Sequence, residues 1–304
     1  MEEGVEATCA RLVAAVGGRV RRAEPLARHT SFRIGGPADV LVEPGSADEL
    51  ARVVRAAAEP RQPLTVLGAG SNLLVGDGGI RGVVVKLGAG FRRVQWNDAG
   101  VTAGAAVHIG KLARAAVERG LSGLEFAEGI PGTVGGALFM NAGAYGGEVG
   151  PAVAAVEGVT AEGTLETIAG DALSFRYRRS GVPDGFLVTA VTFRLTPGAP
   201  EAIARRLAEL REHRIASQPQ GTANAGSIFK NPPGHTAGRL IEATGLKGRR
   251  IGRARISERH ANFIVNDGGA RASDVQALMA EAQRAVWERN GVWLEPEIKL
   301  VGSW

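Results

Sequence analysis

Cysteine is almost absent from the sequence, since Cys9 is the only one among 304 residues. A single thiol cannot form an intramolecular disulfide, and no Cys/His cluster has the spacing of a zinc site. A chain of this length buries enough apolar surface to fold without disulfides or structural metal, and its length favours about two or three compact units. We therefore expect a metal-free protein in a reducing compartment, and the cytoplasm is the expected location.

Long apolar runs are also missing. No uncharged apolar segment approaches the roughly 18 residues that a transmembrane helix needs. The chain does not begin with the charged start, apolar core and small-residue cleavage site of a secretory signal. We therefore expect no membrane association.

Aromatic residues make up only 5% of the chain, and lysine supplies only five of the 36 basic residues. The net charge of +5 and the pI near 9.9 would suit a polyanion partner. However, no platform of interleaved aromatic and basic residues is present, which argues against nucleic-acid binding. Clustered arginines also suit a small phosphorylated ligand.

Apolar periodicity and β-branched runs predict a mixed chain of helices and strands. Ser46 is the expected N-cap of the second helix and Gly120 the expected C-cap of the third. The expected helices are Glu6–Val16, Ala47–Ala58, His108–Arg119, Glu201–His213, His235–Thr244 and Ser273–Asn290. The expected strands are Ala38–Val42, Leu64–Leu67, Val83–Leu87, Phe91–Trp96, Val101–Ala103, Val153–Thr160, Leu165–Ile168, Phe186–Leu195, Asn262–Val265 and Trp293–Val301.

Composition along the chain predicts three domains. An α+β unit ends near Leu87, a strand-rich unit with a glycine-rich insert follows, and Pro197–Pro200 forms the best linker. The expected domains are residues 1–88, 89–197 and 198–304. The pattern leaves open whether the last strand packs with the third domain or returns to the second.

A glycine-rich turn, Leu67–Leu74, follows an expected strand. Consecutive backbone N–H groups in such a turn can converge on a phosphate. Leu73 occupies the position of the third glycine in a dinucleotide fingerprint, and turn and strand follow where that motif needs a helix. A Rossmann fold is therefore not expected, and either phosphate binding or a plain hairpin turn remains open for this segment.

A second glycine-rich stretch runs over Glu128–Ala137 and Asn141–Glu148. Many glycines cost conformational entropy, so a folded domain retains them mainly where backbone approaches a ligand or partner closely. The stretch also contains Ile130, Val134 and Phe139, which makes it too apolar for a solvated linker. This favours a ligand groove over a flexible loop.

Seven segments in order resemble the UDP-N-acetylenolpyruvoylglucosamine reductases. These segments are His29–Gly36, Gly68–Asn72, Ile130–Ala137, Tyr177–Ser180, Asn224–Pro232, His260–Asn266 and Leu294–Ile298. The resemblance covers nearly the whole chain. It is to the shorter type of the family, because only a few residues separate Arg178 from the strand expected at Phe186, with no room for the inserted loop that caps the substrate in the longer type.

The resemblance implies an α+β flavoprotein of three domains. A two-domain FAD-binding unit of the vanillyl-alcohol-oxidase type would be followed by a C-terminal α+β substrate-binding domain. FAD would be bound noncovalently, so neither His29 nor His108 is expected to attach it. NADPH would be the co-substrate, and the protein would be a monomer.

The reaction implied is the reduction of UDP-N-acetylglucosamine enolpyruvate to UDP-N-acetylmuramate, a step in peptidoglycan precursor synthesis and hence in cell shape and division. Hydride would pass from NADPH to FAD and from flavin N5 to C3 of the enolpyruvyl group, while C2 receives a proton. Negative charge then builds on C2 and the neighbouring carboxylate, so cationic and hydrogen-bonding groups aimed there should contribute most.

The resemblance also assigns site residues. Ser227 would donate the proton to C2, while Arg178 and Glu297, the latter protonated or acting through a proton, would flank the substrate carboxylate. Cofactor-binding residues would be Arg33, Gly68, Ala69, Gly70, Ser71, Asn72, Leu73, Ile130, Pro131, Gly132, Thr133, Gly135, Gly136, Asn141, Tyr145 and Gly146. Substrate-binding residues would be Tyr177, Asn231, Lys230 and Arg214.

Two alternatives remain open. Another FAD-dependent oxidoreductase of the same fold, such as an alcohol oxidase, would react with oxygen and ignore the sugar nucleotide. A noncatalytic flavin- or nucleotide-binding module would bind FAD without its reduction by NADPH.

Overall fold

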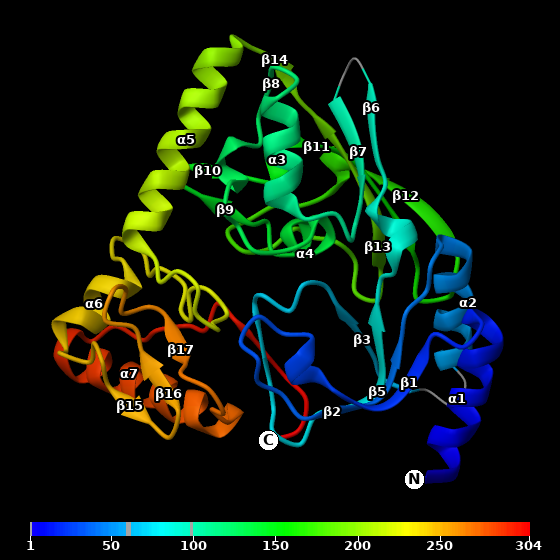
Figure 1. Ribbon diagram of the computed structural model, residues 1–304, viewed down its shortest axis with the longest axis horizontal. Coiled ribbons are helices and arrows are strands. Elements are labelled where there is room, and N and C mark those ends of the chain that lie inside the picture. The colour runs from blue at the N-terminus through cyan, green and yellow to red at the C-terminus, as the bar shows by residue number, and fades with distance from the viewer. Residues whose placement is uncertain (1, 59–61, 98–99) are drawn as a thin grey trace. The chain divides into compact units, whose positions relative to one another are not determined.

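A computed structural model describes residues 2–58, 62–97 and 100–304 (Figure 1). The chain forms two compact units. Unit 1 contains residues 1–22, 40–69 and 82–214, and unit 2 contains residues 23–39, 70–81 and 215–304. Two short segments from the first third of the chain therefore belong to the same unit as the C-terminal third.

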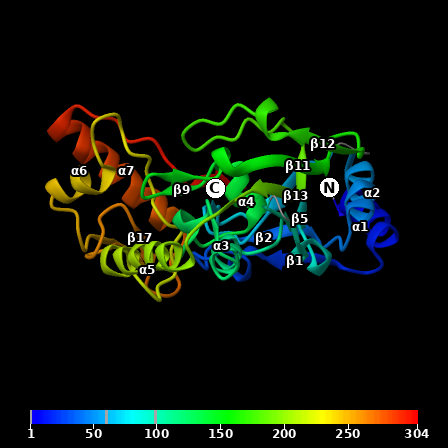
Figure 2. The same cartoon turned by 90° about the horizontal axis from the view of Figure 1, so that it is seen from above.

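The first part of unit 1 is built on two amphipathic helices, α1 (Glu2–Val16) and α2 (Ala47–Ala58), which lie side by side (Figures 1 and 2). Ser46 caps α2 as expected, because its Oγ accepts a hydrogen bond from the Glu49 N–H at 3.2 Å. The helices bury Leu12, Leu50 and Val53 with strand residues in one apolar cluster. A four-stranded sheet has the order β1 (Val20–Pro25), β2 (Pro37–Val42), β5 (Ile80–Lys86) and β3 (Leu64–Leu67), with β3 and β5 parallel. Unit 1 contains all of β3 and residues 20–22, 40–42 and 82–86 of the other three strands.

The second part of unit 1 is a five-stranded antiparallel sheet. Its order is β12 (Leu165–Ala169), β11 (Val153–Val159), β13 (Leu187–Arg194), β7 (Gly100–Gly104) and β6 (Val94–Asn97). Along β13 buried and half-buried residues alternate, which is the period-2 pattern that predicted the strand. A second apolar cluster joins this sheet to α3 (Ile109–Val117) and α4 (Val134–Phe139).

Four small elements complete unit 1. The strands β8 (Leu121–Ser122) and β14 (Thr196–Pro197) pair with each other, as do β9 (Gly143–Ala144) and β10 (Gly147–Glu148). The long helix α5 (Pro200–Ser217) contains the boundary between the two units, since unit 1 ends at Arg214 and the last segment of unit 2 begins at Ile215.

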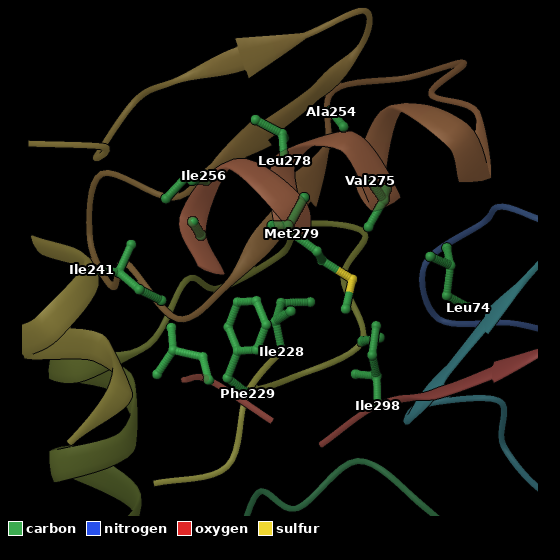
Figure 3. Close-up of a cluster of buried hydrophobic side chains, with 14 of the residues drawn as sticks. Leu74, Ile228, Phe229, Ile241, Ala254, Ile256, Val275, Leu278, Met279 and Ile298 are labelled. Carbon is green, nitrogen blue, oxygen red and sulfur yellow. The ribbon is translucent and has the colours of Figure 1, made fainter. Parts of the chain in front are cut away.

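Unit 2 has a core of its own, in which α6 (Ala237–Ala243) and α7 (Ala272–Asn290) accompany a three-stranded sheet. The strands are β15 (Arg250–Ile251), β16 (Ala254–Ile256) and β17 (Ile264–Asn266). Figure 3 shows Ile228, Phe229, Met279 and Ile298 gathered in this core, with Leu74 contributed from far earlier in the sequence.

The last strand, β18 (Lys299–Val301), pairs in parallel with β4 (Leu73–Val75) rather than with a strand of residues 89–197. The strand expected over 293–301 is therefore shorter than predicted. Leu294 and Ile298 are buried in the core of unit 2, and a single β-bridge joins Pro296 to Phe229. The apolar pattern there reflects packing of an irregular segment.

Two further differences concern local structure. The strand expected from Phe91 begins instead with a 3₁₀ turn at Ala89–Arg92. The helix α4 was not predicted, because Gly135 and Gly136 lie in its first turn and glycine is a poor helix former. In the part of the chain that the structure describes, no helix has the length and apolar character to cross a bilayer.

Candidate active site

The first glycine-rich turn joins β3 to β4, and no helix follows it, which confirms that this is not a Rossmann motif. Gly70 has a φ of +64°, and a Cβ there would lie 2.3 Å from the carbonyl oxygen of His29. The Ser31 N–H donates to the Gly70 carbonyl at 3.1 Å, and the Ser31 hydroxyl donates to the Asn224 carbonyl at 2.7 Å. Three predicted motifs, around residues 31, 70 and 224, therefore meet within unit 2.

The second glycine-rich stretch meets the start of the first one within unit 1. Thr133 caps α4 through a hydrogen bond from the Gly136 N–H at 3.4 Å, and a Cβ on Gly68 would lie 2.9 Å from the Thr133 hydroxyl oxygen. Among the described residues, and leaving aside the local backbone, that hydroxyl is also the only group within 4 Å of a Cβ on Gly136, and a Cβ on Gly146 would meet none. Bare backbone is exposed at Gly136 and Gly146, which fits close approach by a bulky cofactor.

Beside this stretch, polar groups are buried in unit 1. The side chain of Glu128 is only 4% exposed, and its carboxylate lies 3.1 Å from Nε of Arg114. The Arg214 side chain packs against Gly129, where φ is +71° and a Cβ would lie 2.6 Å from Cδ of Arg214. Burial lowers the pKa of Arg214, although the nearby Tyr145 and Glu128 raise it.

Two aromatic contacts join residues of this buried polar cluster, which includes Glu128, Arg214, Tyr145 and His213. The Arg214 guanidinium lies 5.6 Å from the ring centroid of Tyr145, and that ring meets His213 edge-on at 4.9 Å. Buried polar atoms without a hydrogen-bond partner in the described chain include His108 Nδ1 and the Tyr145 hydroxyl. Such atoms suit a polar ligand, because buried donors and acceptors are normally satisfied. Glu128 and His213 were not predicted as site residues, although Glu128 begins the second glycine-rich stretch. His213 lies in no motif of the sequence.

His108 belongs to this cluster as the N-cap residue of α3. Burial lowers the pKa of its imidazole, and the positive charges of Lys111 and Arg114 lower it further. These effects outweigh the negative charge of Glu128, which raises the pKa, and so favour the neutral imidazole.

Arg178 lies in a tight turn of unit 1. The Arg176 and Arg179 backbones exchange hydrogen bonds of 2.8 and 2.9 Å, with Tyr177 and Arg178 at the tip. Arg178 has a φ of +59°, an unusual conformation for a residue other than glycine. Its guanidinium lies 4.7 Å from the ring centroid of Tyr177, whose side chain is half exposed.

Ser227 and Glu297 lie on adjacent backbone segments of unit 2. The Glu297 N–H donates to the Ile228 carbonyl at 2.7 Å, directly after Ser227. Asn262 fixes the same segment, since its side chain accepts from the Phe229 N–H at 2.9 Å and donates to the Phe229 carbonyl at 2.8 Å. Asn72 from the first glycine-rich turn donates to the Glu297 carbonyl at 3.2 Å.

The predicted diphosphate-binding residues of unit 2 both have protein contacts. Lys230 Nζ lies 3.0 Å from a Glu295 carboxylate oxygen. The Asn231 side chain accepts a hydrogen bond from the Ala237 N–H at 3.0 Å and so caps α6. Arg214, the third candidate, belongs to unit 1.

Arg33 was predicted to contact the cofactor. It is exposed, has a φ of +55°, and its main chain is held by a hydrogen bond from Asn266 to the neighbouring Phe32 carbonyl at 3.0 Å. The predicted site residues are thus divided between the units: Arg178, Tyr177 and Arg214 in unit 1, and Ser227, Glu297, Lys230, Asn231 and Arg33 in unit 2. Across the described residues, no group of three or more His, Cys, Asp or Glu side chains is placed to hold a metal ion.

Comparison with known proteins agrees with these features. Residues 38–169 match the family described as FAD binding domain. The chain also shares its fold alone with 4-ethylphenol oxidase from Gulosibacter chungangensis, with a TM-score of 0.52 and 17% identity over 97% of this chain and 65% of that one. The fold and the glycine-lined backbone therefore define a flavoprotein of the vanillyl-alcohol-oxidase type.

The C-terminal part identifies the family. Residues 218–301 match the family described as UDP-N-acetylenolpyruvoylglucosamine reductase, C-terminal domain. The chain is 48% identical to UDP-N-acetylenolpyruvoylglucosamine reductase 2 of Symbiobacterium thermophilum over 94% of this chain and 93% of that protein. It is 47% identical to the reductase of Geobacter metallireducens over 97% and 98% of the two chains.

A solved structure agrees. The UDP-N-acetylenolpyruvylglucosamine reductase of Thermus caldophilus superposes with a TM-score of 0.81 and 42% identity, covering 93% of this chain and 98% of that one. The chain belongs to the UDP-N-acetylenolpyruvoylglucosamine reductase family.

Proposed function

We propose that this protein reduces UDP-N-acetylglucosamine enolpyruvate to UDP-N-acetylmuramate with NADPH and FAD, in peptidoglycan precursor synthesis. The observation that carries the proposal is the hydrogen bond between Glu297 and Ile228, which brings the backbones of two predicted catalytic residues, Ser227 and Glu297, together. Family membership over nearly the whole chain supplies the substrate class.

The residues present fit FAD. Exposed backbone at Gly136 and Gly146 leaves room for a large planar group and a diphosphate. The buried Tyr145 hydroxyl and His108 Nδ1 have hydrogen-bonding capacity that a polar ligand would use. Bound FAD would supply the redox chemistry, accepting hydride from NADPH and delivering it to C3 of the enolpyruvyl group.

The protein residues stabilise the negative charge that develops on the substrate and supply the proton to C2. As C3 receives hydride, negative charge develops on C2 and the substrate carboxylate, and Arg178 stabilises it through its guanidinium. Glu297, protonated or acting through a proton, flanks the same carboxylate. Ser227 then gives its hydroxyl proton to C2, which completes addition of hydride and proton across the double bond.

Substrate binding is assigned to side chains with matching chemistry. Lys230 and Asn231 would contact the UDP diphosphate, and Tyr177 would lie against the substrate near Arg178. Arg214, beside Glu128 and Tyr145 in unit 1, is the remaining candidate for a phosphate contact. No capping loop follows Arg178, since β13 begins at Leu187, so closure of the site falls to other segments.

The protein is further proposed to act as a monomer in the cytoplasm, without nucleic acid or membrane partners. Its scarcity of aromatic residues and lysines argues against a nucleic-acid partner, and its lack of a second cysteine suits a reducing compartment.

Anaerobic stopped-flow spectroscopy of the flavin tests the proposal. NADPH alone should bleach the flavin, and subsequent addition of the enolpyruvyl sugar nucleotide should restore the yellow oxidised form. Ser227→Ala should leave bleaching intact and slow restoration by about two to four orders of magnitude, as expected for loss of a general acid. Restoration at the wild-type rate would remove Ser227 from its role, and reoxidation only by oxygen would favour the oxidase alternative.

A further inference from the structure

The turn that carries Arg178 is attached to the second glycine-rich stretch by one buried side chain, Asn141. The side chain of Asn141 donates from Nδ2 to the Arg176 carbonyl at 3.1 Å and accepts at Oδ1 from the Gly150 N–H at 2.9 Å. Asn141 is completely buried and has a φ of +40°. Asparagine is one of the few residue types, besides glycine, that adopt this conformation readily.

A second contact supports the same attachment. Gly150 packs so closely against Phe175 that a Cβ on Gly150 would lie 2.6 Å from the ring. Phe175 immediately precedes the turn. Gly150 therefore holds Phe175, the residue that enters the turn, and the Asn141 amide holds the first carbonyl of the turn, that of Arg176. The hydrogen-bonded turn then fixes the strained backbone of Arg178.

The backbone of Asn141 is also held in place by hydrogen bonds. Its own N–H donates to the Leu138 carbonyl at the end of α4 at 2.9 Å, and the next residue, Ala142, donates to Ala137 at 2.8 Å. The carboxamide thus connects the end of α4 with the Arg176–Arg179 turn inside unit 1. A residue expected to contact the cofactor has both polar ends of its side chain engaged by backbone.

We propose that Asn141 is a positioning residue that acts on the reaction through the Arg176–Arg179 turn, by holding Arg178 against the charge that develops on the substrate. This proposal rests on the proposed function, because it takes Arg178 as the group that stabilises the substrate carboxylate. It assigns Asn141 to the second half-reaction, whereas a cofactor-binding role would affect FAD affinity and both half-reactions.

The chemistry of the contact suggests the variant. Only a carboxamide donates and accepts at these two sites at once, and an aspartate of the same shape accepts from Gly150 but cannot donate to the Arg176 carbonyl. Asn141→Asp therefore places two oxygen atoms against each other and should release the turn. Displacement of a catalytic group by about 1 Å costs on the order of 100-fold in rate.

The test is a double-mutant cycle on the FAD-loaded full chain, with the rate of flavin reoxidation by the enolpyruvyl sugar nucleotide as readout. Asn141→Asp should slow this step about 100-fold in the wild-type background and in Ser227→Ala. In Arg178→Lys it should have less than about a threefold effect, because the group it positions is already impaired. Asn290→Asp, an exposed change at the end of α7 with the same change in charge, is the matched control and should have no effect.

Results that would refute the positioning role of Asn141 differ from the result that would refute the proposed function. Equal slowing by Asn141→Asp in all three backgrounds, weaker FAD binding with a slower NADPH half-reaction, or an unchanged reoxidation rate would each overturn the positioning role. If Asn141→Asp does not fold, Asn141→Gly serves, since glycine keeps the positive φ and removes both side-chain hydrogen bonds. Failure of the wild-type protein to be reoxidised by the sugar nucleotide would instead refute the proposed function.

Discussion

Arg178 has a backbone conformation that its side chain disfavours. A left-handed conformation costs a non-glycine residue about 1–2 kcal/mol, and such strain persists where the surrounding structure enforces it. At φ +59°, Arg178 is held there by the Arg176–Arg179 hydrogen bonds and by the Asn141 anchor. The strain is consistent with selection for where the guanidinium points.

We expect Arg178→Gly to leave the unfolding free energy close to the wild-type value while impairing flavin reoxidation by the sugar nucleotide. Relief of strain offsets both the added entropy of the unfolded chain, about 0.5–1 kcal/mol, and the lost contact with Tyr177, about 0.5–1 kcal/mol. Urea unfolding measures the first quantity. Arg179→Gly is the control, because Arg179 does not have a positive φ, and this variant should lose about 0.5–1 kcal/mol of unfolding free energy. Equal losses of unfolding free energy in the two variants would argue against strain at Arg178.

The helix α7 begins with a cap supplied from far away in the sequence. Asp77, in the loop between β4 and β5, accepts hydrogen bonds from the N–H groups of Ala272 at 2.8 Å and Ser273 at 3.1 Å, and from the Ser273 hydroxyl at 2.9 Å. Burial raises the pKa of Asp77, but these hydrogen bonds outweigh burial and hold the pKa below its usual value. The negative charge also complements the positive end of the helix dipole.

Asp77→Ala should lower the unfolding free energy by about 1 kcal/mol at pH 7, as loss of an N-terminal cap does. Because the pKa is lowered on folding, the contribution of the charge is fully present above the unfolded pKa and is lost as pH falls through the folded pKa. The difference between wild type and variant should therefore shrink below about pH 4. Urea midpoints from pH 7 to pH 3 measure it, and a difference that grows on acidification would contradict the sign.

Unit 2 is assembled from three separated segments of the chain. Phe32 and Ile34 come from residues 23–39, Leu74 comes from residues 70–81, and all three are buried in one cluster with the core of residues 215–304. The strand β4 also supplies the partner of β18. Burying three large apolar side chains contributes about 5–9 kcal/mol, which is comparable to the whole stability of a small domain.

A fragment of residues 215–304 should therefore not fold on its own. We expect it to show no cooperative thermal transition by circular dichroism and poor dispersion of its amide NMR signals. A chain of residues 1–304 in the same buffer is the control. A cooperative transition in the fragment would mean that the three upstream side chains are not needed for this core.

Most elements followed from the periodicity of the sequence. The helices at residues 47–58 and 273–290, and the strands at 153–160 and 186–195, were predicted within about two residues, because their apolar faces repeat clearly. The helix α4 was missed because paired glycines hide it, and the terminal strand was overestimated because irregular backbone also buries apolar residues. Ser227 and Glu297 became candidates only through the family resemblance, since an isolated serine and glutamate form no periodic pattern.

The sequence by itself determined the mixed helix and strand content, the family, and the non-Rossmann nature of the Leu67–Leu74 turn, because each depends on residues that are close along the chain. Only the tertiary structure decided that Asp77 caps α7, that β18 pairs with β4, and that Asn141 holds the turn of Arg178. These contacts join residues that are 35 positions apart for Asn141 with Arg176, 195 for Asp77 with Ala272, and 226 for Leu73 of β4 with Lys299 of β18. Local pattern cannot specify such pairs, because they form only when the buried faces of several elements pack together.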